Sequence, residues 1–115
     1  MPTDKHKEDS LLNMNKELEI ITDALMPEDI LIQLAEESNE LSQACLKLIR
    51  SNGNNNKPKI THLKAIDNLH EEVADVLVVM KVLNEFTFFD MDKVEEIANA
   101  KMTRWSKRLQ GDWEK

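Results

Sequence analysis

Apolar residues in this chain recur at alternating steps of three and four, and this period limits its fold more than any other feature. The first such run consists of Leu11, Met14, Leu18, Ile21 and Leu25. These steps place side chains on one face of an α-helix, as in the seam of a coiled coil. Only 2 Gly and 3 Pro interrupt the 115 residues. The period and the scarcity of helix breakers together predict an all-α fold.

We expect four helices, and the first two are separated at Pro27. The first covers about residues 11–25, and Pro27 suits the first turn of the second, which should end near residue 50. Residues 51–58 are rich in Asn and contain a Gly and a Pro, so they predict a surface loop. The expected inner face of the second helix consists of Leu31, Leu34, Leu41, Cys45 and Leu48.

The third helix should be the most buried of the four. Thr61 is its expected N-cap, it should end near residue 85, and its segment 76–80 is apolar on every side. Asp90 or Asp92 can cap a fourth helix that ends near Leu109. The expected inner stripe of this last helix consists of Val94, Ile97, Ala98, Trp105 and Leu109.

Size and charge narrow the class of protein. We expect one domain over residues 11–115, preceded by a flexible polar tail of residues 1–10. So small a helical domain leaves apolar surface exposed, which predicts a homodimer or homotetramer. The net charge of −7 argues against nucleic-acid and membrane partners. The polar start is unlike a signal peptide, and a single cysteine, Cys45, suits a cytoplasmic protein.

Two acidic pairs, Glu37 with Glu40 and Glu72 with Asp75, occupy positions where apolar residues are expected. At a spacing of i, i+3, both members of a pair lie on one side of a helix. Glu40 lies ten residues before residue 50, and Glu72 lies eleven after residue 61. An antiparallel hairpin would therefore bring the pairs level to within one residue, about 1.5 Å of helix rise.

Four converging carboxylates predict a site for a hard divalent cation, Mg²⁺ or Mn²⁺, because buried unpaired carboxylates are costly. A solvated acidic face is the alternative for either pair alone, since the chain has 22 acidic residues. Lys101, Arg104 and Arg108 form one basic stripe on the fourth helix. These cations either stabilise the helix through its negative C-terminal end or bind phosphate oxygens opposite the metal.

The motif Glu36-Glu37-Ser38-Asn39-Glu40, followed by Glu72-Val73-Ala74-Asp75, resembles the EExxE…ExxD signature of MazG-like all-α nucleoside triphosphate pyrophosphohydrolases. Dimeric dUTPases and dCTP pyrophosphatases belong to the same superfamily. The stretch 98–105 resembles the later N-x-K-x-x-R element of the MazG group, so the resemblance covers about residues 28–110. The 31 residues between Glu40 and Glu72 are more than we expect for most members of this superfamily, and the added length falls in the Asn-rich loop.

The resemblance implies a four-helix MazG-like bundle, assembled as a dimer or tetramer, that hydrolyses nucleoside triphosphates to monophosphates and pyrophosphate. It also implies site residues. Glu37, Glu40, Glu72 and Asp75 would ligate Mg²⁺, and Glu36 would be an outer ligand or would orient the attacking water as general base. Contacts to the nucleotide or its phosphates would come from Asn99, Lys101 and Arg104.

Two other functions stay open at this point. The chain could be a non-catalytic interaction module that binds its partner through the seam of residues 11–25, or a sensor that binds nucleotides without hydrolysing them. The leading hypothesis is a Mg²⁺-dependent pyrophosphohydrolase that removes unwanted nucleotides from the cellular pool.

Overall fold

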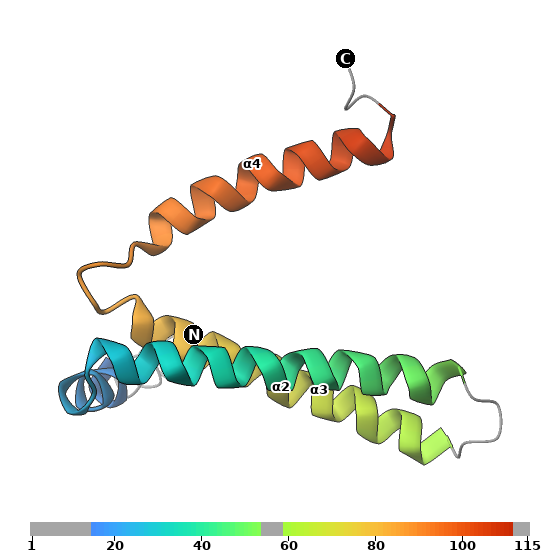
Figure 1. Cartoon of the computed structure of the whole chain (residues 1–115), viewed down its shortest axis with the longest axis horizontal. Coiled ribbons are helices and arrows are strands. Elements are labelled where there is room, and N and C mark those ends of the chain that lie inside the picture. The colour runs from blue at the N-terminus through green and yellow to red at the C-terminus, as the bar shows by residue number, and fades with distance from the viewer. Residues whose placement is uncertain (1–14, 54–58, 112–115) are drawn as a thin grey trace, which may run out of the picture.

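The computed structural model describes residues 15–53 and 59–111, and all regular structure within these ranges is helical. Residues 15–24 form an opening helical segment, which α2 (Pro27–Gly53), α3 (Lys59–Leu83) and α4 (Met91–Leu109) follow (Figure 1). The prediction of an all-α chain is confirmed. None of the described helices combines the length and apolar character needed to cross a membrane. The expected tail of residues 1–10 lies outside the described residues.

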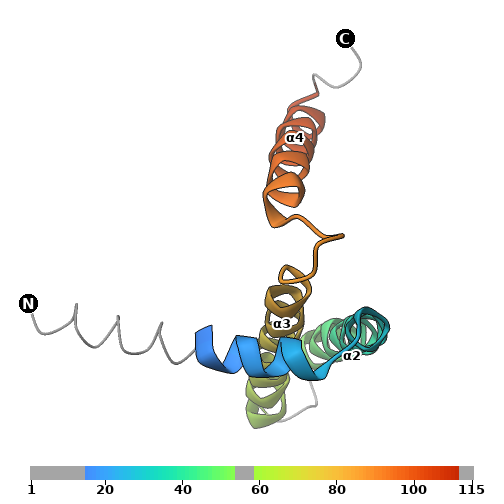
Figure 2. The ribbon, with the colours of Figure 1, turned by 90° about the vertical axis from the view of Figure 1, so that its left-hand side faces the viewer.

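α2 and α3 form an antiparallel hairpin, and the core lies between them at the end away from the hairpin turn (Figure 1). The helical segment 15–24 crosses this end of the pair (Figure 2). Burying apolar side chains there is the main stabilising contribution that the chain makes within itself. The buried residues of this core cluster are Ile30, Val79, Val82 and Leu83, and the half-buried ones packed against them are Leu18, Leu25, Leu34, Phe86 and Phe89.

The helix boundaries agree with the sequence at Pro27 and differ from it at the hairpin turn. α2 continues to Gly53 and α3 begins at Lys59, so the predicted N-cap at Thr61 is wrong and Ser51 is helical. The buried Ser51 hydroxyl donates to the Leu48 carbonyl at 2.8 Å, a contact within the last two turns of α2.

The predicted inner face of α2 is half-buried at Leu34, Leu41 and Leu48 and is wrong at its other two positions. Ile30 and Ala44 are buried, with 2% and 1% of their surface exposed, whereas Leu31 and Cys45 are exposed. Neighbouring helical residues point about 100° apart, so a small error in phase exchanges the buried residue for its neighbour. Among the described helices α3 has the most buried apolar residues, as predicted, although Leu77 and Val78 in its apolar segment remain more than half exposed.

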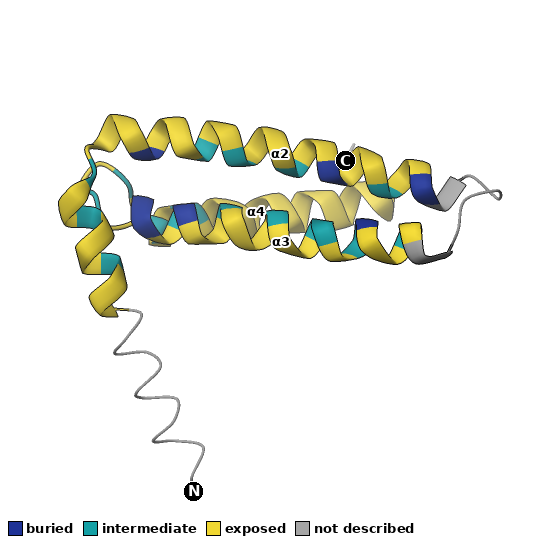
Figure 3. Ribbon diagram, turned by 90° about the horizontal axis from the view of Figure 1, so that it is seen from below, coloured by how far each residue is buried: buried dark blue, intermediate teal, exposed yellow. Residues whose placement is uncertain are grey.

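α4 begins where the sequence predicts and then extends away from the rest of the chain. Asp90 is its N-cap, and the Asp90 carboxylate accepts a hydrogen bond of 2.9 Å from the Asp92 amide. Within the described residues α4 contacts neither α2 nor α3, and none of its residues is buried (Figures 1 and 3). The predicted inner stripe therefore finds no covering surface within one chain, and Trp105 and Leu109 are 59% and 77% exposed.

Candidate metal centre

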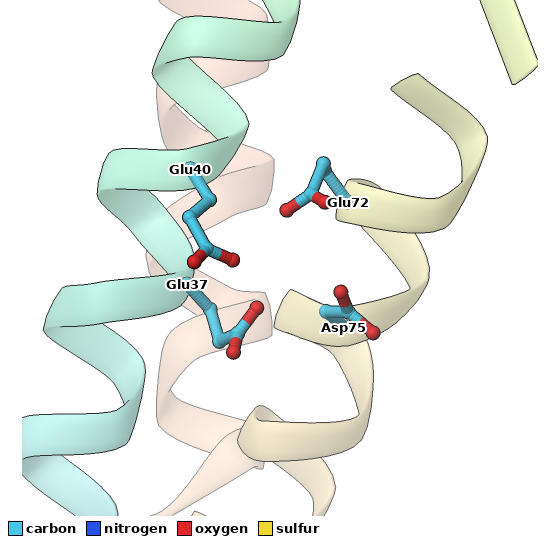
Figure 4. A group of neighbouring side chains, drawn as sticks. All are labelled: Glu37, Glu40, Glu72 and Asp75. Carbon is cyan, nitrogen blue, oxygen red and sulfur yellow. The ribbon is translucent and has the colours of Figure 1, made fainter. Parts of the chain in front are cut away.

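Facing sides of α2 and α3 bring the two acidic pairs together. Glu37 and Glu40 lie one turn apart on α2, and Glu72 and Asp75 lie one turn apart on α3. One carboxylate oxygen from each of the four lies within 4.8 Å of the others, and Figure 4 shows the side chains converging on the space between the helices. Both helices are longer at the hairpin end than predicted, but the pairs remain level. Gly53 lies thirteen residues after Glu40, and Lys59 lies thirteen residues before Glu72.

Two oxygens of this cluster are buried without a hydrogen-bond partner. They are Oε2 of Glu37 and Oε2 of Glu72, one from each helix. The other oxygen of Glu37 accepts a hydrogen bond of 2.9 Å from the side-chain amide of Gln33. A buried acceptor without a partner costs free energy, and this cost is highest for an ionised carboxylate. The cluster therefore contains two buried acceptors that are not satisfied.

Burial and mutual repulsion raise the pKa of two of the four carboxyls. Partial burial is the largest cause for Glu37, and the adjacent charge of Glu40 adds to it, while the Gln33 amide lowers the pKa of Glu37 by a smaller amount. Partial burial also raises the pKa of Glu72, followed by the charges of Glu40, Asp75 and Glu37. Both effects oppose ionisation of these groups when nothing cationic lies between them.

These residues fit a hard divalent cation. All donors are carboxylate oxygens, which suits Mg²⁺ or Mn²⁺ better than Zn²⁺. A cation would provide a partner for the two unpaired oxygens and would offset the repulsion that raises the pKa of Glu37 and Glu72. Exposure of Glu40 and Asp75 leaves one side of the cluster open to solvent, where further ligands could reach the ion.

Glu36, His62 and His70 lie outside this cluster. Glu36 is exposed and does not belong to the group of four, although it directly precedes Glu37. His70 is exposed and its Nδ1 lies 2.9 Å from the Ile66 carbonyl. His62 contacts Ser51 at the hairpin end. Gln33 is the residue that the sequence analysis missed, and its position four residues before Glu37 was the available signal.

The predicted phosphate-binding residues are not next to the carboxylates within one chain. Asn99, Lys101 and Arg104 lie on α4, and all three are exposed. Lys101 and Arg104 line a shallow depression of about 380 Å³ together with Trp105 and Arg108. Because α4 contacts neither α2 nor α3, this basic surface and the acidic cluster remain separate in the described part of a single chain.

The fold and the cluster define an all-α protein with carboxylates placed for a divalent cation. Residues 26–109 match the family described as the MazG nucleotide pyrophosphohydrolase domain, and this chain belongs to that family. The match includes α2, α3 and α4, and therefore every predicted site residue. Searches of curated proteins and of solved structures gave no match.

Proposed function

We propose that this protein is a Mg²⁺-dependent nucleoside triphosphate pyrophosphohydrolase that removes unwanted ribo- or deoxynucleotides from the pool. The observation that carries the proposal is the convergence of four carboxylates, two with unpaired buried oxygens, in a member of the MazG family. Water would add to the α-phosphorus, and the bond from that phosphorus to the oxygen bridging to the β-phosphorus would break. The products are a nucleoside monophosphate and pyrophosphate.

Glu37, Glu40, Glu72 and Asp75 would hold the Mg²⁺ ion, with Mn²⁺ as a substitute. When bound, the ion would lower the pKa of a water molecule and neutralise charge on the phosphates. Glu36, which is exposed and directly precedes Glu37, would orient the attacking water and accept its proton. This role requires the Glu36 carboxylate to come within hydrogen-bond reach of that water. Asn99, Lys101 and Arg104 would contact the phosphates, and an arginine can bind them through two parallel hydrogen bonds.

A second copy of the chain would cover the apolar residues of α4 that are exposed in a single chain. Ile97, Trp105 and Leu109 are 48%, 59% and 77% exposed along one helix, which is unusual for apolar residues at helical spacing. A homodimer or homotetramer would bury this stripe. It would also allow Lys101 and Arg104 of one protomer to approach the acidic cluster of another.

The subunit arrangement can be tested by mixing two inactive variants. Glu40→Gln removes a carboxylate of the cluster, and Arg104→Gln removes a cation of α4. If each site combines the two elements from different protomers, the mixture regains part of the wild-type activity. A mixture that stays inactive, in a protein that light scattering shows to be monomeric, would refute the shared site.

The reaction itself is tested by pyrophosphate release from a panel of ribo- and deoxynucleoside triphosphates, with Mg²⁺ and then with EDTA. Metal-dependent release from some members establishes the activity and names the substrate. Glu40→Gln should abolish release while its circular dichroism remains that of the wild type. Glu71→Gln is the matched control, because Glu71 is an exposed acid on α3 outside the cluster.

The same assay separates the alternatives. A nucleotide sensor would bind a triphosphate with Mg²⁺ and release no pyrophosphate, and an interaction module would show neither response. The interaction module is less well supported, because Leu18 and Leu25 of its supposed binding seam pack against the core of their own chain. A cytoplasmic location follows from the proposed reaction, since its substrates are cellular nucleotides.

A further inference from the structure

A second concavity lies on the hairpin, between the C-terminal end of α2 and the N-terminal end of α3. It has a volume of about 330 Å³. Lys47 and Arg50 line it from α2, and Lys64 lines it from α3. Among the described residues that line this basic pocket, none is acidic. Three cations thus converge in a chain whose net charge is −7.

The helix dipoles account for only part of this charge. Arg50 belongs to the last turn of α2, where a cation stabilises the negative end of the helix. Lys47 lies six residues before the end of α2, and Lys64 lies in the second turn of α3. The dipole effect declines within one turn of a helix end, so it does not explain these two lysines.

The floor of the basic pocket is held by a hydrogen bond between the helices. Ser51 and Ala65 are buried beneath the cations, with 6% and 4% of their surface exposed. The Ser51 hydroxyl donates its one proton to the Leu48 carbonyl and lies 3.0 Å from Nδ1 of His62. The contact between Ser51 and His62 joins the end of α2 to the start of α3. This contact fixes the spacing of the cations that α2 and α3 provide.

Neutral donors complete the set of binding groups. The hydroxyl of Thr61 and the amide of the half-buried Asn68 also line the basic pocket. Ammonium, guanidinium, hydroxyl and amide groups together can donate to several oxygens of one multiply charged anion, and phosphate oxygens are the acceptors that such cations bind most strongly. We propose that the basic pocket binds the phosphate oxygens of a diphosphate or triphosphate without requiring a metal ion.

The basic pocket shares a side of the hairpin with the acidic cluster. Lys47 follows Glu40 by seven residues, and Asn68 precedes Asp75 by seven. Seven residues are close to two full turns, so these residues lie on the same side, separated by about 10 Å along the helices. The phosphates would belong to the bound nucleotide or to released pyrophosphate, and this choice of source rests on the proposed function.

Binding of inorganic pyrophosphate in EDTA tests the basic pocket separately from catalysis. Without a metal ion the acidic cluster repels the anion, so calorimetry at low ionic strength reports on the basic surfaces of the chain, and substitutions in the basic pocket measure its share of the binding. Lys47→Gln combined with Lys64→Gln should weaken binding by about tenfold or more, because charge-assisted contacts are lost. Lys93→Gln combined with Lys107→Gln makes the same change in charge on exposed residues of α4 and should leave binding nearly unchanged.

Equal weakening in both double variants would show a nonspecific charge effect and would overturn the proposal, as would failure of the wild type to bind millimolar pyrophosphate. Circular dichroism checks that the variants fold. Under turnover with Mg²⁺, a raised KM in Lys47→Gln/Lys64→Gln would assign the basic pocket to the nucleotide. An unchanged KM with weaker product inhibition would assign it to released pyrophosphate. Pyrophosphate binding without hydrolysis of any nucleotide would refute the proposed function alone.

Discussion

Glu72→Gln should stabilise the protein in the absence of a metal ion and destabilise it, relative to the wild type, when Mg²⁺ is bound. In EDTA the substitution removes one of the like charges that raise the pKa of the clustered carboxyls, so Glu72→Gln should unfold at a higher temperature than the wild type. With saturating Mg²⁺ the order should invert, because the variant has three of the four carboxylates that converge on the ion.

The size of the metal response follows from mass action. At a free Mg²⁺ concentration of about 100 times Kd, binding to the folded protein stabilises it by about 2.7 kcal/mol. For a chain of this length that corresponds to a rise in Tm of about 10 °C. If loss of one ligand weakens binding by on the order of 100-fold, the same Mg²⁺ concentration stabilises the variant by about 0.4 kcal/mol, a rise of about 2 °C.

Thermal unfolding followed by circular dichroism, with and without Mg²⁺, measures both effects. Glu71→Gln is the control, since it makes the same chemical change one residue away on an exposed position. It should keep the full Mg²⁺ response of the wild type. An identical Mg²⁺ response in Glu72→Gln and the wild type would refute the assignment of Glu72 as a ligand, as would an equal loss of response in Glu71→Gln.

Three further outcomes are expected. Ile30→Ala should lower the free energy of unfolding by about 3 kcal/mol in urea titration, because Ile30 is buried in the core. Asp90→Ala should cost about 1 kcal/mol and Asp90→Asn much less, since asparagine also caps helices. Because the pKa values of Glu37 and Glu72 are raised, the folded protein retains protons that the unfolded chain releases. The stability that these bound protons contribute is full below the ordinary pKa of 4.5 and is lost as the pH rises through the raised pKa values. In EDTA the Tm should therefore fall, as the pH rises above the ordinary carboxyl pKa, more in the wild type than in Glu37→Gln/Glu72→Gln.

The convergence of the acidic pairs could be predicted because it depends on local rules. Spacing of i, i+3 places Glu37 with Glu40, and an antiparallel hairpin of two long helices brings Glu72 and Asp75 level with them. The helix ends at Gly53 and Lys59 were misplaced by similar amounts in opposite directions along the chain, so the register was preserved. The ends themselves were not predicted: Ser51 is helical and contacts His62 of α3, and no sequence pattern shows this contact.

Burial was harder to predict, because it depends on what faces each helix. Ala44 and Cys45 are adjacent, and only the rotation of α2 against α3 decides that Ala44 is buried. The stripe of α4 that includes Ile97 and Trp105 was predicted from its spacing, but spacing does not say which surface covers it. Gln33 was missed because a single polar residue on a helix has no periodicity to distinguish it.

α4 receives no tertiary contact from α2 or α3 in the described residues, so these helices should fold in a definite order. The hairpin contacts join neighbouring parts of the chain, and such contacts form quickly. A helix of 19 residues is only marginally stable alone in water, so α4 would become ordered when another molecule covers it. Refolding should then show a fast phase that is independent of protein concentration, followed by a slower second-order phase whose rate rises with concentration.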